Sequence, residues 1–310
     1  MYRYVLRRLA LLVFTVFCVI TLVFALLARL PGTPGRMILG PNVPNEDVEA
    51  YDRMVGYDRP AMVRYGELLK GIVTRFDFGR SYRSDAPVMA EIARRLPVTL
   101  RLALFGVLVA IVLGVPLGVL AALRRSTLTD SAIVVWAIFL AAIPAFFLAL
   151  LLVYLFSRYL HWLPTHGTGG WKNYVLPVIA MGVPGSTGFI RLTRVLMLET
   201  VNQEYVKTAR AKGLREYKVI WKHAFKNAML PIINGAGLAF SALLGGAIII
   251  ETIFSMPGLG YLALEAVRSK DVPVVMGSTV FLSAVFCIIV FAVDLIYAFA
   301  DPRIRARFSS

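Results

Sequence analysis

The chain has 310 residues, of which 58% are hydrophobic and 16% are charged, and its mean hydropathy is +0.73. Soluble domains hold about 45–50% apolar and about 25% charged residues, so this composition excludes a cytosolic enzyme, a secreted disulfide scaffold and a disordered protein. A net charge of +15 would suggest nucleic acid in a soluble chain, but here basic residues kept on one side of a membrane account for it. We therefore expect an all-α membrane protein that faces membrane lipid and has no nucleic-acid partner.

Six uncharged windows reach or approach the roughly 20 apolar residues that a helix needs to cross a bilayer. In chain order they are 9–28, 102–123, 131–157, 173–190, 227–250 and 272–293. A cleaved signal peptide is an alternative for the first window, but the window is long for that role and no small-residue cleavage site follows. The fourth contains Pro177 and Pro184 and is expected to be a kinked span. The sequence thus predicts six transmembrane helices.

Basic residues indicate how these spans are oriented. Arg7 and Arg8, the pair Arg124 and Arg125, and the many lysines and arginines of 191–226 share one side if the N-terminus is cytoplasmic, as the positive-inside rule favours. Both termini are then cytoplasmic. The expected organisation is a first span within 1–30, an extracytoplasmic loop region at 31–96, a five-helix core at 97–300 with surface helices at 201–229, and a cytoplasmic tail at 301–310.

The segment between the fourth and fifth windows carries the most informative pattern. Small or apolar residues recur near helical spacing from Val206 to Leu214, beside several lysines and arginines. Gly213 is placed to end this helix, because glycine adopts a left-handed backbone at little cost. A second amphipathic stretch covers 216–229, and Pro231 follows near the start of the fifth span. Periodicity alone leaves open whether the first helix docks on another protein or lies on lipid headgroups.

These motifs resemble the permeases of binding-protein-dependent ABC importers in the dipeptide, oligopeptide and nickel group. Ala209-x3-Gly213 with Leu230-Pro231 is similar to the docking signature of that family. Lys207 and Thr208 replace the Glu and the first Ala of that signature, and the spacing from glycine to proline is longer. Further stretches that resemble the same group are 31–34, 56–60, 77–81, 96–100, 251–260 and 294–303. The resemblance therefore covers essentially the whole chain.

The resemblance implies a type I importer fold and a division of labour among subunits. Two homologous permeases would form the pore, two ATPase subunits would bind ATP and Mg²⁺, and an extracytoplasmic binding protein would deliver di- or oligopeptides. Nickel chelates, glutathione and oligosaccharides are the alternative substrates within the group. The chain has no G-x4-G-K-[ST] phosphate loop, which fits a transport subunit of the bacterial inner membrane with no catalytic site or cofactor of its own. By analogy, ATPase docking falls on Glu204, Lys207, Thr208, Ala209, Ala211, Lys212 and Gly213.

An acidic residue inside the sixth window is a separate candidate. Asp294 should lie at the same membrane level as Arg191 and Arg194, and a carboxylate at that depth needs a partner or water. We expect a structural ion pair, with a gating pair or a proton relay as the alternatives. Outside the family, a proton-coupled secondary transporter is the rival, and it would use Asp294 as its coupling residue.

A second acidic candidate follows the fifth window. Glu251 should emerge at the outer surface beside the turn at Pro257 and Gly258. These residues either contact the binding protein or the outer gate, or they mark an interfacial charge, and the sequence leaves both open. No metal site is expected in the chain.

Overall fold

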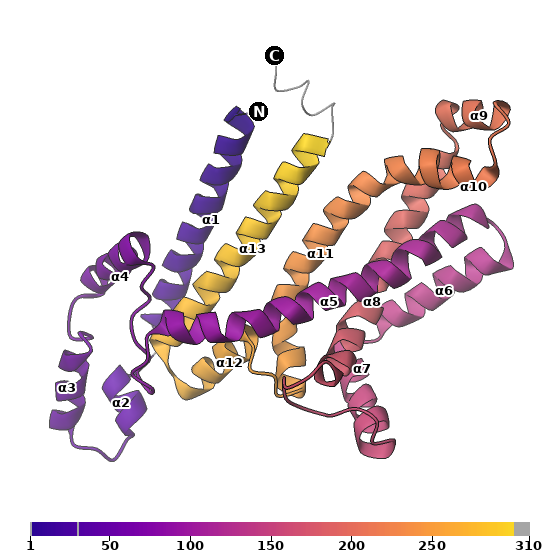
Figure 1. Ribbon diagram of the computed structural model, residues 1–310. Helices are drawn as coiled ribbons and strands as arrows, with labels where there is room; N and C mark the ends of the chain where they lie inside the picture. The colour runs from indigo at the N-terminus through magenta and orange to yellow at the C-terminus, as the bar shows by residue number, and fades with distance from the viewer. Residues whose placement is uncertain (1, 30, 301–310) are drawn as a thin grey trace.

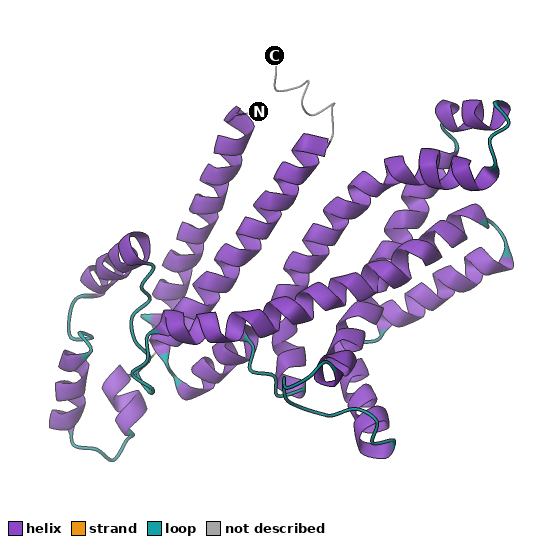
Figure 2. Ribbon diagram, in the orientation of Figure 1, coloured by secondary structure: helices purple, strands orange, loops and turns teal. Residues whose placement is uncertain are grey.

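The computed structural model describes residues 2–29 and 31–300, and it describes side chains for 5–29 and 31–296. Within those residues every regular element is a helix (Figure 2), as the composition and patterning predicted. The predicted tail at 301–310 lies outside the described residues. The helices are α1 (Tyr2–Leu27), α2 (Pro34–Leu39), α3 (Asn45–Met54), α4 (Ala61–Arg75), α5 (Val88–Leu123), α6 (Leu128–Ala142), α7 (Ala145–Leu152), the π-helical η1 (Val153–Tyr159), α8 (Lys172–Val201), α9 (Glu204–Ala211), α10 (Glu216–Lys218), the π-helical η2 (Val219–Phe225), α11 (Lys226–Ile253), α12 (Leu259–Ser269) and α13 (Val272–Ala300).

The number of membrane-spanning helices agrees with the prediction. Five helical stretches of the described chain are long and apolar enough to cross a membrane, and one bent pair of helices brings the number to as many as six. The five single stretches contain α1, α5, α8, α11 and α13, and they overlap the first, second, fourth, fifth and sixth predicted windows. Their ends differ from expectation, however. α5 begins at Val88 and so takes in the last part of the predicted loop region 31–96.

The third window, expected to be one span over 131–157, is broken instead. α6 and the helix formed by α7 and η1 meet at an angle of 89°. Ile143 adopts an extended backbone with ψ of 117°, and Pro144 follows it. Proline has no N–H for the helical ladder and disfavours a helical conformation in the residue before it. The chain therefore turns sharply at this point rather than continuing straight.

Small residues bring α5 and α8 together, and this pair makes the most extensive helix contact in the described chain. A Cβ on Gly114 would lie 2.5 Å from the Cβ of Phe189, and one on Gly118 would lie 2.7 Å from the carbonyl oxygen of Ile190. From the α8 side, a Cβ on Gly182 would lie 2.7 Å from the Cβ of Val109. Glycines of this kind let membrane helices approach backbone to backbone.

We expect Gly118→Ala to lower the free energy of unfolding by about 1–3 kcal/mol, because the new methyl group would overlap the backbone of α8. Thermal unfolding of the purified chain in detergent, read by the loss of the monodisperse peak in size-exclusion chromatography, measures this. Gly188→Ala in α8 is the matched control, since nothing lies within 4 Å of a Cβ there and alanine favours the helix. Equal unfolding temperatures for the two variants would contradict the close approach.

The arrangement of the helices separates two ends of the molecule (Figure 1). The N-terminal end of α1, the C-terminal end of α13 and helix α9 all lie toward the top of the view, with α9 well to the right of the other two. Helices α2, α3 and α12 lie at the opposite end. This is the arrangement that a chain needs if both of its ends and α9 are to be on the same side of a membrane.

The segment between α1 and α5 forms a small cap, defined here as residues 31–87. A buried hydrogen bond joins α2 to α3, since the N–H of Gly35 donates to Asp52 Oδ1 at 2.7 Å. The cap is attached to α1 through Tyr65, whose hydroxyl lies 2.7 Å from Thr21 Oγ1 and whose ring centroid lies 5.1 Å from that of Phe24. The cap is therefore an ordered structure rather than a linker.

Candidate functional site

Helix α9 projects from one end of the molecule (Figure 1) and packs on the rest of the chain with one side only. Val206 and Ala209 are 0% and 5% exposed and belong to an apolar cluster with Val119 of α5 and Met197 of α8. They are three residues apart and so share one helix face. The remaining residues of α9 are exposed. Helix α9 therefore packs on the membrane-spanning helices with an apolar face, and its polar face is exposed.

The turn after α9 confirms the predicted glycine stop. Gly213 has a φ of +73°, in the left-handed region, and its N–H donates to the carbonyl oxygen of Arg210 at 2.9 Å. The N–H of Leu214 donates to the carbonyl oxygen of Ala209, which completes the hydrogen-bond pattern of a Schellman motif. Across the turn, Arg210 Nη2 lies 2.8 Å from Glu216 Oε1. Backbone and side chains together therefore fix the direction in which the chain leaves α9.

Most residues expected to dock an ATPase lie on this exposed surface. They are Glu204, Lys207, Thr208, Ala211, Lys212 and Gly213, and we call them the α9 surface. Ala209 differs, because it faces the apolar cluster and its methyl group is covered by the chain itself. Glu204 and Lys207 pair with each other at 2.7 Å, a contact open to solvent on both sides.

Exposed aromatic residues next to the α9 surface were not singled out from the sequence. Tyr205 is 42% exposed, Tyr217 is 73% exposed and Trp221 is 41% exposed. The rings of Tyr217 and Trp221 are 6.3 Å apart, one helical turn from each other. The sequence did contain a pattern that could have identified them. Large aromatic residues one helical turn apart on an otherwise lysine-rich helix are typical of a surface that binds another protein.

The second helix of the predicted pair is not separate. The stretch 216–229 was expected to be a surface helix, but α10, η2 and α11 form one continuous helix over Glu216–Ile253. Pro231 accordingly lies inside α11 rather than at its start. The missing N–H of this proline is tolerated because neighbouring groups in a helix bundle compensate for it. The turn after α9 therefore leads directly into a membrane span.

At the opposite end, Glu251 is fully buried, with 0% exposure, where the sequence predicted a surface position. Thr99 Oγ1 donates to Glu251 Oε1 at 2.6 Å, and the N–H of Tyr261 donates to Oε2 at 2.7 Å. Thr99 in turn accepts the N–H of Leu259 at 2.8 Å. These four residues, which we call the Glu251 cluster, join α5, α11 and α12.

The position of the Glu251 cluster follows from a chain reversal after α11. The N–H of Met256 donates to the carbonyl oxygen of Glu251 at 2.8 Å, and α12 then folds back over the end of α11. A Cβ on Gly258 would lie 2.2 Å from the carboxyl carbon of Glu251, so only glycine fits there. Of the residues expected at the outer gate or the binding-protein contact, Glu251 and Gly258 are buried and Pro257 is exposed.

Asp294 does not pair with Arg191 or Arg194 as expected. Its Oδ2 lies 2.9 Å from Nη1 of Arg8 on α1. Arg194 instead forms a two-point contact with the buried Asp130 of α6, with Nε to Oδ1 at 2.7 Å and Nη2 to Oδ2 at 2.8 Å. The expectation was wrong because α1 packs on α13, whereas α8 packs on α6, and sequence depth alone does not show which helices are neighbours.

The chain also matches family models over nearly its whole length. Residues 114–306 match the model described as "Binding-protein-dependent transport system inner membrane component", and residues 1–103 match the model of the N-terminal part of such membrane components. The chain belongs to this family. It is a permease subunit of an ABC importer in the peptide and oligopeptide group, a multi-pass protein of the inner membrane. Subunits of this kind have no ATPase site of their own and work with ATPase and substrate-binding partners.

Permeases of two bacteria are similar to this chain over nearly its whole length. A protein of Brucella abortus named as a peptide transport system permease is 38% identical over 309 residues, which cover 97% of this chain and 98% of the relative. The glutathione transport system permease protein GsiC of Escherichia coli K12 is 37% identical over 305 residues, covering 98% and 99%. A solved chain of the inward-facing MetNI methionine ABC transporter covers 69% of this permease and 97% of its own length, with a TM-score of 0.55 and 17% identity. That likeness shows the type I importer permease fold.

The ion pair between Arg8 and Asp294 gives a prediction for the permease. Asp294 is 21% exposed and Arg8 is 41% exposed, so we expect their coupling energy to be about 1 kcal/mol or less. A double-mutant cycle with Asp294→Asn and Arg8→Gln, read by thermal unfolding in detergent, measures it. Transport by Asp294→Asn should also keep the pH dependence of the wild type. Loss of a proton-driven component would instead favour Asp294 as a coupling residue.

Proposed function

We propose that this permease forms half of a translocation pathway for di- or oligopeptides. A second, homologous permease would supply the other half, and an extracytoplasmic binding protein would deliver the substrate. Support comes from the relatives at 37–38% identity, one named for peptide and one for glutathione transport. Glutathione is itself a short peptide, so both names share one substrate chemistry. Nickel chelates and oligosaccharides are the alternatives within the group.

We further propose that the α9 surface receives an ATPase subunit. The observation that carries this is the mounting of α9, with Val206 and Ala209 buried against the spans and the opposite face exposed. A helix fixed in this way transmits a push to the bundle, whereas a helix lying on lipid headgroups needs its apolar face for the membrane. Each transporter would have two ATPase subunits that bind ATP and Mg²⁺. Their movement would be transmitted through α9 and would switch the transporter between inward-open and outward-open states.

The proposed orientation places both termini and α9 in the cytoplasm. Arg7 and Arg8 belong to the first turns of α1, and several lysines belong to α9 and the segment after it. The start of α1 and helix α9 both lie toward the top of Figure 1. The positive-inside rule favours the cytoplasm for that end. The cap and the turn after α11 would then be on the side of the binding protein, with Pro257 among the exposed residues of that turn.

Uptake by whole cells tests the substrate. Cells lacking this permease should lose uptake of a labelled dipeptide, and a plasmid copy should restore it. Labelled glutathione, nickel and an oligosaccharide are measured in parallel. Loss of nickel uptake alone would overturn the peptide assignment and leave the importer class intact.

The energy source is tested in the same cells. Uptake should stop when the phosphate-loop lysine of the partner ATPases is replaced, because this chain cannot hydrolyse ATP. Uptake that persists there and collapses when the proton gradient is dissipated would contradict an ATP-driven importer.

A further inference from the structure

An open pocket of about 460 Å³ lies between the cap and the adjoining ends of α1 and α13. Phe24 of α1 and Met276 of α13 give it an apolar floor. The cap contributes four arginines to its walls, which are Arg53, Arg59, Arg64 and Arg80. A smaller apolar recess adjoins the pocket, shares Phe24 and Arg64 with it, and extends along α1 to Leu27. Arginines beside an apolar surface suit an amphiphilic anion, because the arginines can bind its charged group and the apolar surface can bind its hydrocarbon part.

Two of these arginines are already neutralised and two are not. Arg59 pairs with Glu67 at 2.6 Å, and Arg80 pairs with Asp85 at 2.8 Å. Arg53 and Arg64 form no ion pair with any residue that the structure describes. Asp77 also lines the pocket and forms no ion pair within the described residues, so Arg53 and Arg64 together leave an excess of positive charge there.

Arg64 is held in place without using its hydrogen-bonding capacity. Its guanidinium carbon lies 3.9 Å from the ring centroid of Tyr57, a cation–π contact. Its Nε is buried and has no hydrogen-bond partner within the described residues. Buried polar groups normally have a partner, so an unsatisfied guanidinium nitrogen beside an open pocket indicates a group that the protein chain does not itself provide.

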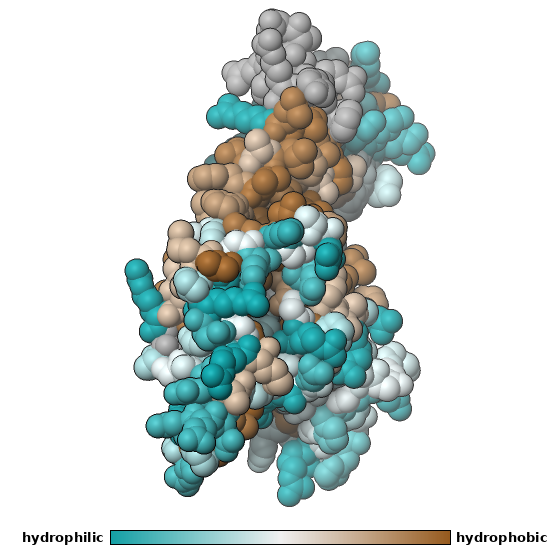
Figure 3. Space-filling view, turned by 90° about the vertical axis from the view of Figure 1, so that its left-hand side faces the viewer, coloured by the Kyte–Doolittle hydropathy of each residue, from teal (hydrophilic) through white to brown (hydrophobic). Residues whose placement is uncertain are grey.

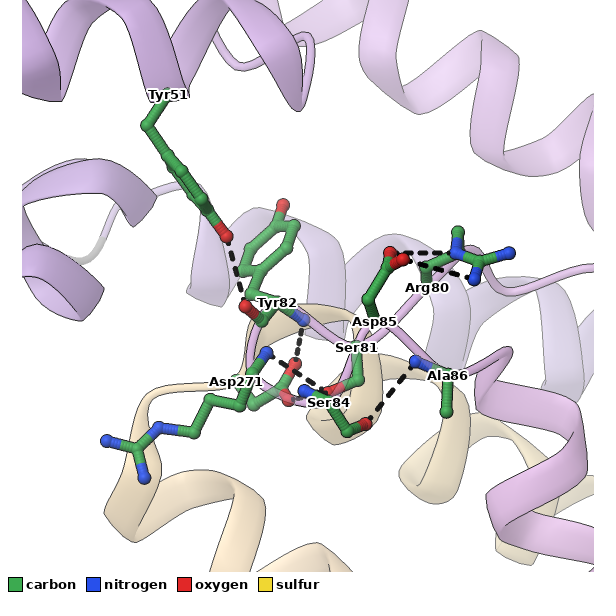
Figure 4. A network of polar contacts seen from close by, with 9 residues as sticks. Tyr51, Arg80, Ser81, Tyr82, Ser84, Asp85, Ala86 and Asp271 are labelled. Atoms are coloured by element: carbon green, nitrogen blue, oxygen red, sulfur yellow. Dashed lines mark hydrogen bonds and ion pairs between the residues drawn. The ribbon is translucent and has the colours of Figure 1, made fainter.

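The part of the pocket lining that contains Tyr82 is fixed by the network shown in Figure 4. Asp271, at the start of α13, accepts hydrogen bonds from the hydroxyl of Ser81 and, at 3.2 Å, from the N–H of Tyr82. The hydroxyl of Tyr51 on α3 donates to the carbonyl oxygen of Tyr82 at 3.0 Å. Burial raises the pKa of Tyr82 to about 12, so its phenol stays neutral and able to donate at physiological pH. The pocket is therefore built before any ligand arrives.

The pocket lies at the level where a bilayer changes from acyl chains to headgroups. Figure 3 shows the apolar band on this side of the molecule ending at the hydrophilic cap. The spans that reach the pocket, α1 and α13, are the least buried of the five unbent ones, with 6% of the apolar window of each covered by the rest of the chain. Lipid is therefore the neighbour expected beside the pocket, whereas the tightly packed α5–α8 pair lies elsewhere in the bundle.

We propose that this pocket binds the phosphate of an anionic phospholipid from the outer leaflet, with Arg53 and Arg64 on the phosphate. The first carbons of the lipid chains would occupy the recess beside Phe24 and Leu27. Guanidinium groups suit phosphate because their donors match its oxygens in pairs. The apolar recess favours a lipid over a free phosphate ion, which would leave that surface uncovered. The assignment to the outer leaflet rests on the orientation proposed above, and it does not depend on which substrate is transported.

Native mass spectrometry of the full-length permease in dodecyl maltoside tests the proposal. The probes are dioleoylphosphatidylglycerol, dioleoylphosphatidylcholine and inorganic phosphate. The double variant Arg53→Gln/Arg64→Gln should bind phosphatidylglycerol roughly tenfold more weakly than the wild type, since hydrogen bonds to charged groups are lost. Phosphatidylcholine carries the same phosphate beside a choline cation, so its binding should be weaker than phosphatidylglycerol binding in the wild type. It should also fall in the double variant, by a smaller factor.

Arg83→Gln is the matched control, because Arg83 is an exposed arginine of the same cap that does not line the pocket. If the double variant fails to fold, Arg53→Gln alone serves, since Arg53 is exposed and should still weaken binding severalfold. Equal weakening by Arg83→Gln, or undiminished lipid binding by the double variant, would overturn the proposal. Displacement of the lipid by equimolar inorganic phosphate would also overturn it and assign the pocket to a soluble anion.

Discussion

Replacing Ala211 by tryptophan should release the ATPase subunits from the purified transporter while leaving the permease folded. Ala211 is the last residue of α9 and is exposed, so a bulky side chain there meets no other part of the described chain but blocks close approach by a partner. The apparent affinity for the ATPase subunits should fall at least about tenfold, as expected for disruption at the centre of a protein interface. ATPase activity co-purifying with the tagged permease in mild detergent is the measurement.

Gly213→Pro should have the same effect by a different route. Proline fixes φ near −65°, whereas Gly213 has +73°, and it removes the N–H that donates to Arg210. Gly213→Ala keeps that N–H and should cost about 1 kcal/mol through backbone strain, so it should retain most of the ATPase.

The control for Ala211→Trp is Ala61→Trp. Ala61 is an exposed alanine at the first position of α4, in the cap at the other end of the molecule. The Ala61→Trp variant should co-purify as much ATPase activity as the wild type. If Ala211→Trp retains full ATPase activity and Gly213→Pro also does, the α9 surface is not where the ATPase docks.

Removing the carboxyl of Glu251 should destabilise the permease by several kcal/mol. Glu251→Ala leaves the hydroxyl of Thr99 and the N–H of Tyr261 buried without their acceptor, and each such group costs about 1–3 kcal/mol. It also leaves a cavity where three helices meet. Thermal unfolding in detergent should show a fall well beyond that of Gly118→Ala.

Glu251→Gln separates hydrogen bonding from packing in the same site. Glutamine keeps the volume and one acceptor oxygen but places donors opposite a donor, so its effect should fall between those of alanine and the wild type. Glu265→Ala on α12 is the control, because that carboxylate is 55% exposed and should contribute less than about 1 kcal/mol. A Glu251→Ala variant as stable as Glu265→Ala would show that the Glu251 cluster is not what joins α5, α11 and α12.

Features of the permease that depend on local sequence were predictable. The spans follow from the length of apolar runs, and the end of α9 follows from the conformational freedom of Gly213. The break between α6 and α7 was not predictable, although Pro144 is visible in the sequence, because Pro97 and Pro116 lie inside α5 without ending it. Whether a proline bends or breaks a span depends on the neighbours that satisfy the freed backbone groups.

Features that depend on which helices are neighbours could not be predicted. Asp294 pairs with Arg8 because the first and last spans lie side by side, and Arg194 pairs with Asp130 because α8 lies beside α6. Glu251 is buried because α12 folds back over α11, a reversal that no periodicity indicates. Helix α9 and its glycine turn were therefore predictable from local sequence, whereas the partners of side chains that meet another helix were not.

The continuous helix Glu216–Ile253 has a mechanical consequence. Its 38 residues amount to roughly 57 Å at the α-helical rise per residue, and they connect the turn after α9 to the Glu251 cluster. Figure 1 shows this helix as curved, so roughly 57 Å is its length along the axis, and a rigid tilt of roughly 5° about one end would displace the other by at most roughly 5 Å. The π-helical stretch η2 near its base interrupts the α-helical hydrogen-bond pattern, and such stretches often lie at functional sites, so we expect the helix to pivot there. A movement of ångströms at one face of the membrane thus needs only a few degrees of rotation at the other.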